Sequence, residues 1–408
     1  MHQNIEKDEI LAKNNKGNIK KASFGLKEVI GIVIITAITG FLVGLAVKQK
    51  KTETQLSRYE EELLSNYEYI LTNYYKNIDA RDLVSVAIKG MIDYLDDPYA
   101  SYISNDNVDN FNIVINGEYE GIGIQIGYNA KEELIVTYVF PNSSAENGGL
   151  KAGDIFIKVN DESVTGKTLD EIKDLISTFN DKEFNVTYKR NDTEYQTKLK
   201  REKVIIESVK NRIIEKNENK IGYLKLNNFA TNSYSQFKEK LEALEEDNIE
   251  SLIIDLRDNT GGELETVTNI VSLFIPKGKV IYQMKDKDTI TKTYSESNTT
   301  RNYKIVVLVN EYSASASELM TGALKEMYGA TIIGVNTYGK GTAQKVMTLE
   351  NGERYKFTTK EWLTAEGNSI EGIGIEPTIK IEQSEEYYTN PNDENDSQLN
   401  RALEFLCQ

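Results

Sequence analysis

The sequence has 408 residues but only one histidine, His2, and one cysteine, Cys407, which excludes several kinds of site. A Ser-His-Asp triad and a Cys-His pair both need a histidine beside the nucleophile, and one at the extreme N-terminus does not serve. One cysteine cannot form an intrachain disulfide, and a structural zinc site lacks its usual ligands. We expect no metal or other cofactor. If the chain is a hydrolase, a serine activated by a lysine is the leading option.

Charge is divided unevenly along the chain. Residues 1–51 hold nine lysines and four acidic residues, a net charge of +5, whereas the whole chain has a net charge of −16. Residues 52–408 therefore have a net charge of −21. An acidic body repels nucleic acid backbones, so nucleic acid is not an expected partner.

The basic N-terminal part surrounds an apolar run, residues 29–47, that contains no charged side chain. As a helix this run is about 28 Å long, close to the thickness of a hydrocarbon core. We expect a retained transmembrane helix rather than a cleaved signal peptide, whose apolar region is shorter, although Gly44-Leu45-Ala46 forms a weak cleavage site. A buried globular helix is a third interpretation, and the absence of a polar stripe disfavours it.

Composition and hydrophobic periodicity predict a multi-domain α/β protein. Apolar residues recur at helical spacing over 52–78 and 80–94, whereas alternating strands separated by turns follow up to residue 203. Six segments result: a polar cytoplasmic tail (1–28), the transmembrane helix (29–47), a helical region (48–112), a β-rich module (113–203), an α/β core (204–382), and an acidic tail with a C-terminal helix (383–408).

Three loops of the α/β core bring together residues suited to catalysis. The first and second follow the buried strands 251–257 and 304–310, and the third follows strand 331–335. Carboxyl ends of parallel strands are where α/β enzymes place reactive groups. Each loop also has a simpler interpretation, because serines often cap helices and glycine-rich segments often form turns.

The second loop places Ser315 at the entrance to a helix, where unpaired backbone N–H groups and the helix dipole stabilise an oxyanion. The amide of Ala316 is a natural donor, and Gly261-Gly262 offers a second one. Ser313 and Ser317 are equally eligible as simple helix caps.

The third loop contains Lys340 between two glycines, where it can face Ser315. A lysine acts as a base only when neutral, and burial lowers a lysine pKa enough to permit this. Gln344 can orient the amine through a hydrogen bond.

These loops resemble the three sequence blocks of the carboxyl-terminal processing peptidases, also called tail-specific proteases. The blocks are Asp255–Gly262, Asn310–Glu318 and Thr337–Gln344, and the segments Asp97–Tyr102 and Gly149–Asp154 also look like parts of this family. The resemblance covers about residue 60 to the end. Thr260 departs from it, because the family usually has proline there.

The resemblance implies Ser315 as nucleophile, Lys340 as general base and Gln344 as its orienting residue, with an oxyanion hole from the backbones of Gly262 and Ala316. It implies a peptidase core of the ClpP/crotonase-like type and a PDZ domain over the β-rich module. PDZ domains capture a chain terminus as an added strand.

In the PDZ domain, Gly121-Ile122-Gly123 resembles the loop that binds the terminal carboxylate; alternatively, these glycines only shape a strand entry. The expected partners are proteins with apolar, unstructured C-termini. The expected location is a bacterial cytoplasmic membrane, with one membrane span and the catalytic part outside the cytoplasm. A homodimer through the N-terminal helices is a hypothesis from their amphipathic faces.

Two other functions compete with a C-terminal processing endopeptidase. One is a PDZ scaffold that binds partners through an inactive peptidase-like domain. The other is an acyl-transfer or hydratase enzyme, which the sequence supports less because no acyl-carrier or nucleotide motif is present. All three candidate catalytic side chains are present, which favours the peptidase.

Overall fold

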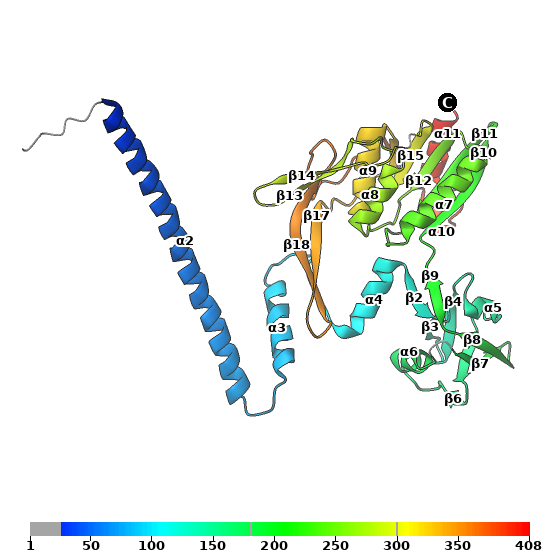
Figure 1. The fold of residues 1–408 in the computed structure, drawn as a ribbon. Helices are drawn as coiled ribbons and strands as arrows, with labels where there is room; N and C mark the ends of the chain where they lie inside the picture. Colours follow the sequence, from blue (N-terminus) through cyan, green and yellow to red (C-terminus); the bar gives the residue numbers. More distant parts are fainter. Residues whose placement is uncertain (1–25, 180–181, 299–300) are drawn as a thin grey trace, which may run out of the picture. The chain divides into compact units, whose positions relative to one another are not determined.

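The computed structural model describes residues 26–179, 182–298 and 301–408 (Figure 1). The chain divides into two compact units, Met1–Ala87 and Ile88–Gln408. Most of the predicted polar tail, residues 1–28, lies outside the described residues.

The first unit is dominated by one long helix, α2 (Leu26–Asn73). This helix runs without interruption through the predicted span 29–47 and most of the predicted helix 52–78. It ends at Asn73, five residues before the predicted end. Helix α3 (Ala80–Asp93) follows. Among the described residues, a helix that combines the length and the apolar character needed to cross a membrane is not found, so the predicted transmembrane helix is unsupported.

The β-rich module of the second unit is a small antiparallel domain with one well-formed helix. Its main sheet has the strand order β3-β4-β5-β7-β8, with β6 beside β5, while β2 pairs with β9 separately. The elements are β2 (Glu118–Gly121), β3 (Ile124–Tyr128), β4 (Leu134–Val139), α5 (Ser144–Asn147), β5 (Ile155–Val159), β6 (Glu162–Ser163), α6 (Leu169–Ser177), β7 (Glu183–Arg190), β8 (Thr193–Lys200) and β9 (Glu202–Ile205). Helix α6 begins with the predicted capping box, in which Thr168 and Glu171 bond each other's backbone N–H groups.

The α/β core contains a six-stranded sheet in the order β10-β11-β12-β15-β16-β19. All its neighbouring strands from β11 onward are parallel, as predicted from their continuous apolar sequences. The elements are β10 (Val209–Lys216), β11 (Asn219–Leu226), α7 (Ser233–Glu246), β12 (Ser251–Asp255), α8 (Leu264–Ser272), β15 (Lys304–Val309), α9 (Ala316–Ala323), a π-helical turn η1 (Leu324–Tyr328), β16 (Thr331–Gly334), β19 (Ile379–Lys380), α10 (Glu385–Thr389) and α11 (Ser397–Leu406).

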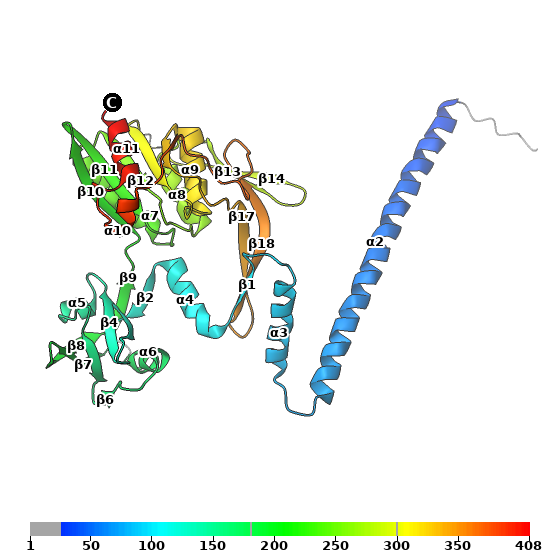
Figure 2. The ribbon, with the colours of Figure 1, turned by 180° about the vertical axis from the view of Figure 1, so that it is seen from behind.

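Helices cover both faces of this sheet, as the two opposite views show (Figures 1 and 2). Helices α7, α8 and α9 share one apolar core with alternate strand residues such as Leu252 and Ile254. The intervening residues, such as Ile253, pack with α11 on the other face. Because alternate residues of a strand face opposite sides, strands covered on both sides are apolar throughout.

A second, antiparallel sheet was not predicted. It has the order β1-β18-β13-β14, with β17 beside β18. The elements are β1 (Ser101–Ile103), β13 (Val280–Lys285), β14 (Ile290–Tyr294), β17 (Thr342–Thr348) and β18 (Arg354–Leu363). Strand β1 comes from the region predicted to be helical, where α4 (Asn105–Asn116) follows it. It pairs with β18 in the register Ser101 to Lys356, which brings this early segment into the α/β core.

Candidate active site

Ser315 occupies a strained turn between β15 and α9. Its φ and ψ are 56° and −114°, which an L-residue adopts only when its surroundings impose them. A sharp strand-to-helix turn of this kind exposes a nucleophile at the carboxyl end of a sheet. Ser315 is partly exposed, whereas its neighbours Ser313 and Ser317 are fully buried. Their hydroxyls donate to the carbonyls of Leu256 and Asn259, both at 2.8 Å, so Ser315 is the accessible serine of the three.

The glycine loop lies directly against this turn. A Cβ added to Gly261 would come within 2.9 Å of the Ser315 Cβ, so only glycine permits the approach. Gly262 forms a parallel bridge with Phe229, in which the amide of Glu263 and the carbonyl of Gly261 take part. That bridge leaves the amide of Gly262 unused.

The amide of Ala316 is likewise unused, because a first helical residue has no acceptor within its helix. Among described residues, no hydrogen bond from the Gly262 or Ala316 amide is found. Within the described part of the chain, both predicted oxyanion-hole donors are therefore unpaired.

Buried Asn259 shapes the glycine loop, a role that sequence reasoning missed. Its side-chain oxygen accepts from the Gly261 amide at 2.9 Å, and its side-chain nitrogen donates to the Leu226 carbonyl at 2.8 Å. Its carbonyl accepts from the Ala314 amide at 3.1 Å. Asn259 thus links the glycine loop to the serine turn, and its position two residues before the glycines is the available signal.

Glu318 is the second residue that sequence reasoning left without a role. Its buried carboxylate accepts from the backbone amides of Ser315 at 2.8 Å, Gly339 at 2.6 Å and Lys340 at 2.9 Å. The Thr337 hydroxyl donates to it at 2.6 Å. Burial raises the pKa of Glu318, and these four donors oppose that rise by stabilising the carboxylate. One side chain therefore connects the Ser315 turn to the Lys340 loop.

Hydrogen bonds to its backbone amide and carbonyl fix the position of Lys340, and its side chain is partly buried. The Trp362 indole N–H donates to its carbonyl at 3.0 Å. Burial lowers the pKa of Lys340, and the positive charge of Lys356 lowers it further. Nearby carboxylates oppose both effects. A lowered pKa raises the fraction of neutral amine, the form that can accept a proton.

Ser315 and Lys340 lie in loops at the carboxyl edge of the parallel sheet, whereas Gln344 lies on β17 of the second sheet. Hydrogen bonds between described residues do not join the three candidate catalytic side chains. Among the described residues, no bond connects the Lys340 amine to Ser315 or to Gln344. The Gln344 amide instead donates to the hydroxyls of Thr342 at 3.2 Å and Thr358 at 3.1 Å. The role predicted for Gln344, orienting the lysine amine, therefore stays a prediction.

The predicted carboxylate-binding loop of the β-rich module lies between β2 and β3. Ile122 is buried in the domain core, and Gly123 has a φ of 87° with no room for a Cβ beside Ser143. Strand β3 is an outer strand of its sheet, so its free edge can accept an added strand. As for metals, the described residues contain no group of three or more His, Cys, Asp or Glu side chains suited to an ion.

Family models match three parts of the chain. Residues 220–381 match peptidase family S41, residues 135–190 match a PDZ domain, and residues 43–107 match the N-terminal domain of the activating protease CtpB.

Known proteins resemble most of the chain. A probable CtpA-like serine protease of Staphylococcus aureus (strain COL) is 32% identical over 362 residues, covering 86% of this chain and 71% of the relative. Its counterpart in Staphylococcus haemolyticus (strain JCSC1435) is 32% identical over 380 residues, covering 90% and 75%. Among solved structures, a photosystem II D1 C-terminal processing protease matches with 25% identity and a TM-score of 0.47, over 77% of this chain and 85% of that chain.

The family matches and the protease relatives define a serine peptidase with a PDZ domain. The chain belongs to peptidase family S41, and the CtpA-like serine proteases are its relatives.

Proposed function

We propose that this peptidase cleaves proteins near their C-termini, with Ser315 as nucleophile and Lys340 as general base. The observation that carries the proposal is the Glu318 carboxylate, which holds the Ser315 and Lys340 backbones at once. A nucleophile and its base must keep a fixed relation, and a shared buried anchor supplies one.

The proposed reaction is acyl transfer through a covalent intermediate. Neutral Lys340 removes the Ser315 hydroxyl proton as the oxygen attacks the peptide carbonyl, and the ammonium then returns the proton to the leaving amine. The amides of Gly262 and Ala316 receive the negative charge that forms on the carbonyl oxygen. In the described arrangement the amine is not bonded to Ser315, so its side chain must turn before it accepts the proton.

We assign substrate recognition to the PDZ domain. An unstructured C-terminus would add a strand to the free edge of β3, with its carboxylate at Gly121-Ile122-Gly123. The preference for apolar tails rests on the family resemblance.

Membrane attachment is proposed from the sequence alone. Residues 29–47 contain no charge, and Lys27 and Lys48 flank them closely. The proposal places the catalytic part outside the cytoplasm of a bacterium; extraction from membranes by alkaline carbonate would contradict an integral anchor. Exposed apolar residues of α2, such as Leu63 and Leu64, motivate a homodimer, which a monomeric mass in detergent would exclude.

The deciding experiment is cleavage of an unfolded reporter that ends in an apolar tail. The full chain is compared with Ser315→Ala and Lys340→Ala, and with the matched controls Ser235→Ala and Lys238→Ala on α7. We expect activity in the wild type and controls and loss in both site variants, with products located by mass spectrometry. Activity in Ser315→Ala would reject the nucleophile. Tail binding without cleavage by every form would favour the scaffold.

A further inference from the structure

The segment Asp97-Pro98-Tyr99 lies beside the candidate base, although about 240 positions separate them in sequence. The Asp97 carboxylate accepts from the Tyr99 amide at 2.9 Å, which closes the turn. It also accepts from the Thr358 amide of β18 at 3.1 Å. Together with the pairing of β1 and β18, these bonds fix the turn on the second sheet.

Tyr99 meets the Lys340 amine face-on. The Nζ atom lies 4.3 Å from the centre of the Tyr99 ring, well within the range of a cation–π contact. The ring is therefore positioned through its own turn, which is bonded to β18.

The same turn reaches Gln344. The Thr358 hydroxyl accepts from the Gln344 side chain at 3.1 Å, while the Thr358 amide donates to Asp97. Strand β18 thus joins the turn to two of the three candidate catalytic residues. No other described aromatic ring has a cation–π contact with Lys340.

We propose that Tyr99 is a positioning residue whose ring face holds the Lys340 ammonium at the active site. The inference rests on the proposed role of Lys340 as base. The amine becomes an ammonium when it takes the Ser315 proton, and the ring face stabilises that charged form over the neutral one. The ring also limits where the amine can go, so the proton returns from a defined position.

Several other charged groups act on the same amine and set the background for a pH test. They are Lys356, Asp97, Glu371 and Glu318. Substitution of Tyr99 by leucine or phenylalanine leaves all four in place, so a change in pH dependence reports the ring itself.

The test compares Tyr99→Leu with Tyr99→Phe in the full chain, and uses Tyr94→Leu, an exposed tyrosine of the same segment, as matched control. Tyr99→Leu should lower the limiting kcat/KM about tenfold and move its acid limb to lower pH by up to about one unit, because the ammonium loses the ring. Tyr99→Phe keeps the ring face and should keep the limb. Tyr94→Leu should match the wild type.

Two outcomes would overturn the proposal. One is an unmoved acid limb in folded Tyr99→Leu, and the other is a limb shifted as far in Tyr99→Phe as in Tyr99→Leu. If Tyr99→Leu fails to fold, two measurements still test the proposal. They are the acid limb of Tyr99→Phe and the pKa of Lys340, measured by NMR of labelled lysine with Lys340→Ala to assign the signal. Failure of the proposed function is separate, because Lys340→Ala would then cleave as well as the wild type.

Discussion

The two edges of the parallel sheet differ in how completely their polar groups are satisfied. At the carboxyl edge, Ser315 has a φ of 56° and Gly262 a φ of 150°, and two backbone amides remain unpaired. Strain and unused donors persist only where the surroundings impose them, and they concentrate at functional sites.

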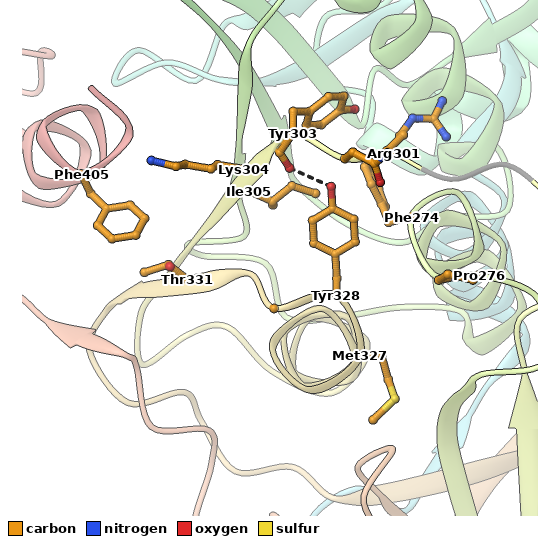
Figure 3. Close-up of a pocket in the computed structure, with 12 residues that line it drawn as sticks. Phe274, Pro276, Arg301, Tyr303, Lys304, Ile305, Met327, Tyr328, Thr331 and Phe405 are labelled. Atoms are coloured by element: carbon orange, nitrogen blue, oxygen red, sulfur yellow. Dashed lines mark hydrogen bonds between the residues drawn. The ribbon is translucent and has the colours of Figure 1, made fainter. Parts of the chain in front are cut away.

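The amino edge has a cavity of about 490 Å³ (Figure 3), and among the described residues that line it, a non-glycine residue with a positive φ is not found. The Arg301 guanidinium is paired with Glu245 and donates to the Leu273 carbonyl at 2.6 Å. The Tyr328 hydroxyl donates to the Tyr303 carbonyl at 2.7 Å, the dashed line of Figure 3. These two polar side chains are therefore already paired within the protein. The comparison teaches that strain and unused donors identify this site better than the size of a cavity.

The largest contrast between the edges should come from adding one methyl group to each. Gly262→Ala places a Cβ 2.3 Å from the Phe229 carbonyl oxygen, which displaces the amide proposed for the oxyanion hole. We expect kcat/KM to fall by at least about a hundredfold. The matched change Gly329→Ala, at a φ of 84° with no atom within 4 Å of the new Cβ, should cost about 1 kcal/mol of stability and no activity. Equal loss of activity in both would remove the distinction.

A smaller contrast is expected between two carboxylates. In Glu318→Gln an amide replaces an acceptor that faces four donors, so at least one donor loses its partner. The loss should destabilise the fold by about 1–3 kcal/mol and lower kcat by about tenfold or more. Glu245→Gln at the amino edge should cost about 1 kcal/mol and leave kcat unchanged. Thermal unfolding and kinetics on the same samples measure both, and a normal kcat in Glu318→Gln would reject its linking role.

The carboxyl edge was largely predictable from sequence, whereas its supports were not. Periodicity located β12, β15 and β16, and therefore the loops that contain Gly262, Ser315 and Lys340. The hydrophobic periodicity of a short segment could not reveal that Ser101 pairs with Lys356. Pairing between strands so far apart in the sequence does not change the periodicity of either strand. For the same reason the second sheet and the place of Tyr99 were missed. Glu318 was visible as an acid three residues after Ser315, but only its burial shows that it joins two loops.

A moderate effect is expected on the pH dependence of kcat/KM, which should respond to the charges around Lys340 at the carboxyl edge. Burial and Lys356 lower the pKa of Lys340, and the proposed active form is the neutral amine, so kcat/KM should rise with pH along a limb below the ordinary lysine value of 10.5. Lys356→Met removes a like charge, which raises the pKa of Lys340 and moves the limb to higher pH by up to about one unit. Kinetics across the pH range check this. A limb that moves to lower pH, or stays in place, would contradict the assignment of Lys340.

The smallest effect is expected at the cavity of the amino edge. Lys304 is exposed there, and its Nζ atom lies 6.0 Å from the centre of the Phe405 ring, at the limit of a cation–π contact. Lys304→Ala should therefore change stability by less than about 1 kcal/mol and leave kcat/KM within about twofold of wild type. Stability and kcat/KM are measured beside the wild type, so that even a small difference between the two proteins is detected. A clear loss of activity would mean that the amino edge communicates with Ser315 through β15, and the contrast between satisfied and unsatisfied edges would no longer locate function.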